Sequence, residues 1–398
     1  MIPPSIEVRA QPGQPLGMTP AVFMRDFWQK EPLLIRGAFP EFTAPISGNE
    51  LAGLACEDEV LARIVSHDRD TDRWTVENGP FAEERFLHMR SADWTLLVQD
   101  VDRWDADVRK LLESFDFLPR WRVDDIMVSF AAPGGSVGAH VDHYDVFLLQ
   151  GQGQRHWAID NRKKPALAAR KDVPLKLLQC FSVSHEWVLD PGDMLYLPPG
   201  VPHFGVAVDA CLTFSIGMRA PSAAELLVAW AESRAQQLDE SVRYTDPDQA
   251  PASDPGLVDS AAVGRLRRLL ESTLNSTDAE LSEFFARYLS TFRLAGSELS
   301  KPRRSSETTI AARLAKGAAL RADAGVRLTF IDASDATALL FGHGESLACT
   351  RAAARACTGA KPISSHWWAS ATDDDKAGVR AALSRGWLRF EPTLSHRS

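Results

Sequence analysis

The pattern of apolar and polar residues changes twice along the chain, after about residue 122 and after Pro221. In the first hundred residues, 20–30 and 92–104 have helical periodicity and 32–39 resembles a strand, which predicts a mixed α/β segment. From about Val123 to Arg219, short runs of β-branched and aromatic residues are separated by Gly and Pro, with no ten-residue helix between them. This region predicts an antiparallel sandwich or barrel. The six predicted strands are residues 125–131, 145–150, 154–159, 185–189, 193–198 and 211–218.

A helical region follows, and two capping boxes mark where its helices begin. Ser222 with Glu225 precedes the helical pattern of residues 226–238, and Thr277 with Glu280 precedes another. Their apolar faces could close on the barrel or on a second copy of the chain. We predict a helical dimerisation module over residues 221–300, and therefore a homodimer. The remaining helical patterns are residues 264–274 and 280–292, after a Pro- and Asp-rich loop at 244–256.

The last quarter of the chain, residues 301–398, begins with a polar hinge at 301–307. Strand patterns at 326–331, 338–341 and 387–390, together with two helical patterns, predict a winged-helix-like domain. Because this segment has an acidic triplet at 373–375 and no dense basic helix, we expect a protein-contact or structural role and no direct nucleic-acid binding.

Composition narrows the class of protein. The chain has 398 residues, 45% of them apolar, and a net charge of −9, which disfavours a general phosphate-backbone binder and is compatible with a basic protein partner. Its five cysteines include no CxxC pair, which favours a reducing compartment. Neither a signal sequence nor a long apolar span is apparent, so we expect a cytoplasmic protein that does not enter the membrane.

Three residues of the barrel region suggest a metal site. His140 and Asp142 are two residues apart, so an extended chain directs both side chains to one face, and His203 follows a later strand pattern. Two histidines and one carboxylate leave positions open for a 2-oxo acid and O2, as in non-haem Fe(II) oxygenases. An HxD pattern alone occurs by chance in many proteins. His143 has the opposite parity to His140, so we expect it at the surface.

Arg155 is the second indication, because strand alternation places it on one face with Trp157 and Ile159. A guanidinium among core residues requires an anionic partner, which could be a ligand carboxylate such as that of 2-oxoglutarate or an internal Asp or Glu. Ser129 and Thr213 could line the same pocket with hydroxyls or be ordinary strand residues. Tyr144 shares the parity of His140 and could border a substrate channel.

The blocks at residues 27–40, 121–157, 190–203, 215–221 and 244–248 resemble, in the same order, those of the bacterial JmjC-type (cupin superfamily) ribosomal oxygenases. That family hydroxylates an arginine of a large-subunit ribosomal protein. The resemblance implies an α+β protein with a double-stranded β-helix core over residues 1–220, a helical dimerisation module and a C-terminal winged-helix domain. It also implies Fe(II) held by His140, Asp142 and His203, 2-oxoglutarate held by Arg155 and Ser129, and O2 as a cosubstrate.

Two alternatives remain at this stage. The same iron centre could act on another protein, as a demethylase or hydroxylase, or on a small molecule. A non-catalytic ribosome-binding protein could instead retain the barrel as a scaffold. The metal triad together with Arg155 argues against the scaffold, because a scaffold has no need for a buried cation beside three metal-binding side chains.

Overall fold

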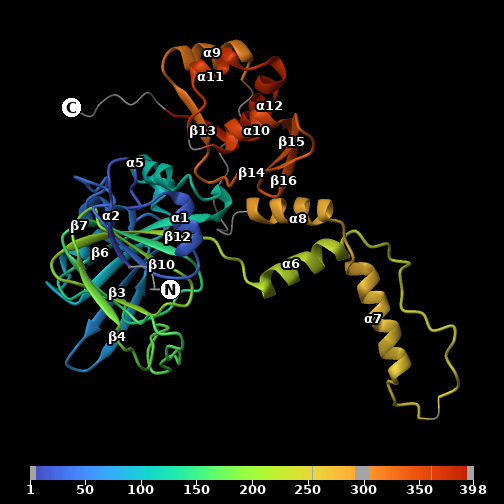
Figure 1. Ribbon diagram of the computed structural model, residues 1–398, viewed down its shortest axis with the longest axis horizontal. Helices are drawn as coiled ribbons and strands as arrows, with labels where there is room; N and C mark the ends of the chain where they lie inside the picture. Colours follow the sequence, from blue (N-terminus) through green and yellow to red (C-terminus); the bar gives the residue numbers. More distant parts are fainter. Residues whose placement is uncertain (1–5, 253, 292–304, 360, 392–398) are drawn as a thin grey trace. The chain divides into compact units, whose positions relative to one another are not determined.

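The computed structural model describes residues 6–252, 254–291, 305–359 and 361–391 (Figure 1). The chain divides into two compact units, one extending to Ala220 and the other beginning at Pro221. The predicted boundary between residues 300 and 301 lies outside the described residues. Within the described parts of the chain, no helix has both the length and the apolar character needed to span a membrane.

The first unit is built on two β-sheets. Its strands are β1 (Glu7–Arg9), β2 (Leu33–Arg36), β3 (Ala62–Asp68), β4 (Arg73–Asn78), β5 (Trp94–Val98), β6 (Val123–Ala131), β7 (Val146–Gln152), β8 (Arg155–Ile159), β9 (His185–Leu189), β10 (Met194–Leu197), β11 (His203–Ala207) and β12 (Cys211–Met218). The larger sheet has the order β1-β2-β10-β7-β12-β6-β5-β3-β4, and the smaller has the order β11-β8-β9. Apart from the parallel pair β1 and β2, neighbouring strands are antiparallel.

Alternation along the strands separates an inner and an outer apolar layer. Val146 and Leu148 of β7 pack with Trp157 of β8 in the layer that joins the two sheets. Phe147 and Leu149, which alternate with them along β7, belong to the larger outer core under the N-terminal helices. The helices of this unit are α1 (Pro20–Asp26), α2 (Gly48–Leu54), α3 (Glu83–Leu87), α4 (Val101–Trp104) and α5 (Ala106–Lys110), with 3-10 turns η1 (Leu111–Phe115) and η2 (Arg120–Arg122).

All six strands predicted between residues 125 and 218 are confirmed, as β6, β7, β8, β9, β10 and β12. The helix predicted over residues 92–104 is wrong, because Trp94–Val98 form β5 and only Val101–Trp104 are helical. Every residue of β5 is buried, and pairing with β3 and β6 outweighs the helical periodicity of this apolar run. The sequence also gave no indication of β11, which begins at His203.

The second unit contains helices and two small sheets. Its elements are α6 (Ala223–Ala235), α7 (Ser260–Leu274), α8 (Asp278–Ser290), α9 (Glu307–Ala315), β13 (Ala319–Ala322), β14 (Thr329–Asp332), β15 (Thr337–Gly342), β16 (Glu345–Thr350), α10 (Arg351–Thr358), α11 (Ser365–Ser370), α12 (Asp373–Ser384) and β17 (Leu388–Glu391). Both predicted capping boxes are confirmed, at the starts of α6 and α8. Trp230 of α6 packs on Phe284 of α8 with ring centroids 4.9 Å apart. The hydroxyl of Thr329 in β14 donates to the Ala286 carbonyl, which attaches α8 to the sheet β14-β15-β16.

Candidate metal and cosubstrate site

The two predicted histidines are brought together by the backbone. The amide N of His140 donates to the His203 carbonyl at 3.1 Å, and that of His203 donates to the His140 carbonyl at 3.0 Å. This isolated bridge links the loop after β6 to the first residue of β11, and the imidazole centroids lie 4.2 Å apart. Asp142 is held beside them because its carbonyl accepts from the amide of Gly200 at 2.8 Å.

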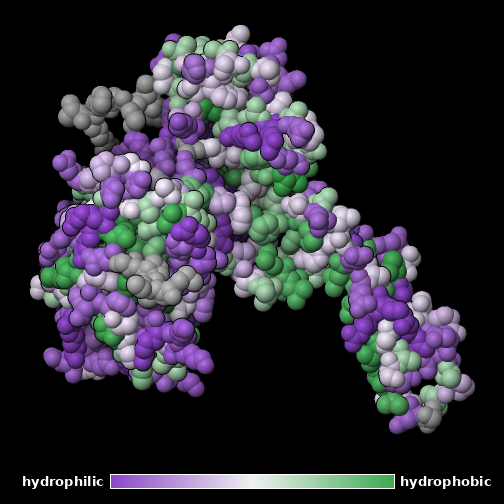
Figure 2. Space-filling model, viewed as in Figure 1, coloured by the Kyte–Doolittle hydropathy of each residue, from purple (hydrophilic) through white to green (hydrophobic). Residues whose placement is uncertain are grey.

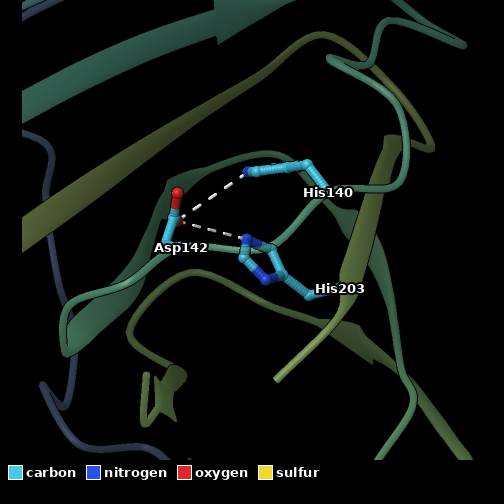
Figure 3. A group of neighbouring side chains, drawn as sticks. All are labelled: His140, Asp142 and His203. Carbon is cyan, nitrogen blue, oxygen red and sulfur yellow. Dashed lines mark ion pairs between the residues drawn. The ribbon is translucent and has the colours of Figure 1, made fainter. Parts of the chain in front are cut away.

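The three side chains converge on a common point (Figure 3). The Nε2 atoms of His140 and His203 lie 3.8 and 3.6 Å from Oδ2 of Asp142. These separations exceed a hydrogen bond, whereas two ligands each about 2.1 Å from one ion lie at most about 4.2 Å apart. Among the described residues, His140, Asp142 and His203 form the one group of three or more His, Cys, Asp or Glu side chains that is arranged to hold a metal ion. The exposed His143 is not part of it.

Both imidazoles are oriented by backbone carbonyls. Nδ1 of His140 lies 3.0 Å from the Gly138 carbonyl, and Nδ1 of His203 lies 3.0 Å from the Val201 carbonyl. Because a carbonyl only accepts, each Nδ1 carries the proton and each Nε2 keeps its lone pair for a metal. Burial, reinforced by His140, lowers the pKa of His203 to about 4, so this ring is neutral at physiological pH.

A buried serine connects the metal-binding loop to the smaller sheet. Ser136 Oγ donates to the Gly205 carbonyl of β11 at 2.7 Å and accepts from the Gly138 amide at 3.0 Å. Gly138, whose φ of +79° favours glycine, then presents its carbonyl to His140. The same Gly205 carbonyl accepts from Nη2 of Arg155 at 3.3 Å. One chain of hydrogen bonds therefore runs from the arginine to the His140 ring.

Arg155 lies on the inner face of β8 and is only 3% exposed. Its guanidinium carbon lies 5.0 Å from the Trp157 ring centroid, and Gly205 leaves the space, since a Cβ there would come within 2.8 Å of Arg155 Nε. Burial lowers the pKa of this guanidinium. In the part of the chain that the structure describes, Arg155 has no acidic partner within ion-pair distance and its Nε has no hydrogen-bond partner. The internal salt bridge is thus absent from the described residues, and an anionic ligand would complete the site.

Ser129 and Thr213 are both buried and face each other across β6 and β12. The Thr213 hydroxyl donates to Gln150 at 3.2 Å. Thr95 Oγ1 on β5 and Trp157 Nε1 on β8 are also buried without a hydrogen-bond partner in the described part of the chain. Strand alternation predicted that Trp157 shares a face with Arg155, but it did not predict that its indole N–H is unpaired. Nothing in the sequence distinguished Thr95 from other threonines in strands. The donors present suit a carboxylate-bearing ligand next to a divalent metal, so the residues fit both groups.

An acidic residue missed by the sequence reasoning also belongs to this region. Asp125 has the same strand parity as Ser129 in β6, and its Oδ2 accepts from the amide of Asp100 at 3.1 Å. Burial, together with Asp100 and other neighbouring acids, raises the pKa of the Asp125 carboxyl to about 7. Partial burial and the carboxylates of Asp142 and Asp125 raise the pKa of Tyr144. Asp125 therefore lies near the tyrosine that adjoins the metal-binding carboxylate.

Comparison with known proteins identifies the class. Residues 110–226 match the JmjC domain family, and residues 181–289 match the AraC-like ligand binding domain. The chain is 38% identical over 274 residues, 68% of its length and 71% of the relative, to the ribosomal protein uL16 3-hydroxylase of Escherichia coli K12. It is 41% identical over 217 residues, 54% of its length and 52% of the relative, to a probable ribosomal oxygenase of Haemophilus influenzae.

Solved structures agree over nearly the whole chain. An X-ray structure of E. coli YcfD superposes with a TM-score of 0.80 at 32% identity, covering 94% of this chain and 99% of that one. A structure of YcfD, a ribosomal oxygenase from E. coli, in complex with cobalt and 2-oxoglutarate has a TM-score of 0.78 at 32% identity, covering 95% and 99%. The fold and the matched domain are those of a JmjC-type 2-oxoglutarate-dependent dioxygenase. Within that class, the chain belongs to the ribosomal oxygenase family.

Proposed function

We propose that this protein is an Fe(II)- and 2-oxoglutarate-dependent hydroxylase of an arginine side chain in a large-subunit ribosomal protein of the uL16 type. The observation that carries the proposal is a two-histidine, one-carboxylate cluster next to a buried arginine that lacks an acidic partner among the described residues. The E. coli relative is a uL16 3-hydroxylase, which supports the substrate class and a cytoplasmic setting where ribosomes are assembled.

His140, Asp142 and His203 would hold the iron, and Arg155 would hold the distal carboxylate of 2-oxoglutarate. The chemistry supplied by bound iron and cosubstrate is oxidation of an unactivated C–H bond by O2, coupled to conversion of 2-oxoglutarate into succinate and CO2. Because the carbonyls of Gly138 and Val201 hold the two Nδ1 atoms, both Nε2 atoms would be free to bind the ion. Ser129 lies on the inner face opposite Thr213, which is consistent with a hydroxyl in the cosubstrate pocket.

Asp125 supports arginine as the acceptor. Among the described residues this carboxyl has no cation within ion-pair distance, although burial and nearby acids make its ionisation unfavourable. A substrate guanidinium would supply the missing positive charge and form bidentate hydrogen bonds to the carboxylate. A neutral imidazole supplies neither, so arginine fits this position better than histidine.

Mass spectrometry tests the function directly. In cells lacking the gene, we expect one large-subunit ribosomal protein to lose the mass of one oxygen atom, with fragmentation assigning that oxygen to an arginine. The purified enzyme should restore it only with iron and 2-oxoglutarate present. Identical spectra, or an oxygen on another residue type, would contradict the proposal and favour a different protein or a small molecule as substrate.

Asp125→Asn tests the arginine assignment. We expect the KM for the ribosomal protein to rise about 10- to 100-fold, because one charged hydrogen-bonded contact is lost, while the KM for 2-oxoglutarate stays unchanged.

The same variant makes a prediction for stability. The pKa of Asp125 in the folded protein is about 7, above the ordinary 3.8, so the folded protein keeps this proton and its stability falls as pH rises from about 4 to 7. Asn avoids that loss, so the variant should melt higher than wild type at pH 8 and equally at pH 4. Asp124→Asn, at the exposed neighbouring position, is the control for the KM of the ribosomal protein.

The helical part of the second unit supports a homodimer. Val263, Leu266, Leu270 and Leu274 form a stripe along α7, each at least 38% exposed. Hydrophobic residues also gather over α6 and α8 (Figure 2), where Leu226, Trp230 and Phe284 line a groove of about 690 Å³. An amphipathic helix with an uncovered apolar stripe gains by packing against a second copy. Sedimentation equilibrium yielding the mass of one chain, 43.8 kDa, would contradict this arrangement.

We further propose that residues 221–300 act as the dimerisation module and residues 301–398 as a winged-helix-like domain. Among the described residues after 304, helices α9 to α12 pack with the strands β13 to β17 around a separate apolar core. The antiparallel sheet β14-β15-β16 is consistent with a wing. The acidic triplet at 373–375 forms the first turn of α12, where carboxylates stabilise the helix, which favours a structural role.

A further inference from the structure

The loop between β8 and β9, residues 160–184, concentrates positive charge in an acidic protein. It contains Lys163, Lys164, Lys171 and Lys176, four of the ten lysines of the chain, whose net charge is −9. Two arginines add to them, and residues 161–184 include a single acid, Asp172. This local excess of positive charge belongs to the surface of the loop, and the net charge of the whole chain does not reveal it.

This lysine loop is anchored at the candidate metal site. The Leu178 amide donates to the Ala139 carbonyl at 2.9 Å, one residue before His140. Leu177 is buried in a cluster with Trp74 and Leu97. Arg170 forms an ion pair of 2.9 Å with Asp72 in the turn between β3 and β4, beside which the loop lies (Figure 1). The apolar residues therefore hold the loop on the barrel, next to the reacting centre.

The arginines and the lysines of the loop have different surroundings. Arg162 pairs with Asp160 at 2.6 Å, and Arg170 pairs with Asp172 at 2.7 Å. The four lysines are all exposed, and in the described structure none of them makes an ion pair or a side-chain hydrogen bond. The arginines thus stabilise the loop, whereas the ammonium groups of the lysines remain available to an external anion.

The charge of the loop is opposite to that required for the proposed substrate. A ribosomal protein that presents an arginine is basic and suits the acidic Asp125, but four lysines beside the same site repel it. The lysines instead match a polyanion that lies next to the substrate arginine. In a ribosomal particle the anion in contact with the protein is RNA, whose phosphates bind lysine without base specificity.

We propose that the lysine loop docks on the RNA phosphate backbone adjoining the substrate protein, so that the enzyme recognises the ribosomal protein together with its RNA. This inference rests on the proposed function. It differs from the expectation of no nucleic-acid binding, which considered only total charge and the C-terminal domain. The contact is electrostatic, so it weakens steeply with salt and is insensitive to RNA sequence.

Fluorescence anisotropy with a labelled RNA hairpin tests the contact on the full-length protein. Over about 50 to 200 mM KCl, each lysine–phosphate contact contributes about 0.7–0.9 to the slope of log K against log salt. Replacing the four lysines by alanine should therefore reduce the slope by about 3 and weaken binding at least about tenfold at low salt. The matched control removes the same charge elsewhere, with alanine at Lys30, Lys110, Lys316 and Lys361, and should bind as wild type does.

A parallel assay separates this inference from the function. The four-lysine variant should hydroxylate RNA-free ribosomal protein at least as fast as the wild type, because the lysines repel the basic protein. Absence of hydroxylation by the wild type would count against the proposed function alone. Wild type that binds no RNA, or an equal loss of binding in the control, would overturn the docking proposal. Competition by polyglutamate as effective as that by RNA would also overturn it, because the loop would then be a site for acidic protein.

Discussion

Asp142→Ala protein is expected to bind cobalt(II) more than about 100-fold more weakly than wild type and to release no succinate from 2-oxoglutarate. The substitution removes the carboxylate that lies 3.6 to 3.8 Å from both imidazole Nε2 atoms and leaves only the two histidines as ligands. Loss of partners that merely orient a metal ligand costs about 10- to 100-fold in affinity, so loss of the ligand itself should exceed about 100-fold. Isothermal titration with cobalt(II) measures this without turnover.

His143→Ala is the matched control for that experiment. This histidine is adjacent to Asp142 in the sequence but exposed and outside the cluster. We expect wild-type cobalt affinity and wild-type succinate release from it. If Asp142→Ala retained cobalt binding, or if His143→Ala lost it, the metal-binding group would have to be reassigned. A melting temperature near that of wild type for both variants would show that the fold persists.

The candidate ligands could be predicted from sequence because their spacing is local or their setting is distinctive. His140 and Asp142 are two residues apart, and Arg155 lies in a strand whose alternation is clear. The groups that support them could not be predicted, because they act through distant backbone. Ser136 reaches the carbonyl of Gly205, 69 residues away, and only the paired sheets bring these positions together.

The two wrong predictions of secondary structure also arise from contacts between residues that are distant in the sequence. The run at residues 94–98 is apolar throughout, so its periodicity alone does not distinguish a buried strand from a helix, and pairing with β3 and β6 decides the outcome. β11 was missed because Gly205 interrupts its short apolar run, yet it pairs with all of β8. Pairing between segments far apart in the sequence thus determined both that β11 forms and where it places His203.

Asp125 illustrates a further limit of sequence reasoning. It is one of 53 acidic residues in the chain, and nothing in its neighbours distinguishes it from Asp124. The structure separates them, because strand parity turns Asp125 inward while Asp124 is exposed. The lysine loop is the opposite case, since its composition was visible in the sequence but its attachment to Ala139 was not.

Arg155→Met is expected to raise the KM for 2-oxoglutarate by about 100-fold, corresponding to the loss of two charged hydrogen bonds of about 1.5 kcal/mol each. Calorimetric binding of 2-oxoglutarate to the cobalt-loaded protein should weaken by a similar factor, while cobalt affinity changes little. Because the guanidinium is buried without an acidic partner among the described residues, a methionine of similar volume should leave the ligand-free protein as stable or more stable.

The direction of the stability change makes this prediction decisive. A structural ion pair broken by Arg155→Met would lower the melting temperature and leave cosubstrate affinity unaffected. If Arg155 instead binds the cosubstrate, the Arg155→Met variant should have an unchanged or higher melting temperature and bind 2-oxoglutarate poorly. Arg162→Met, on a side chain that is 54% exposed and paired with Asp160, controls for loss of positive charge near the same strand. If it matched Arg155→Met in both measurements, Arg155 would have no specific role in holding 2-oxoglutarate.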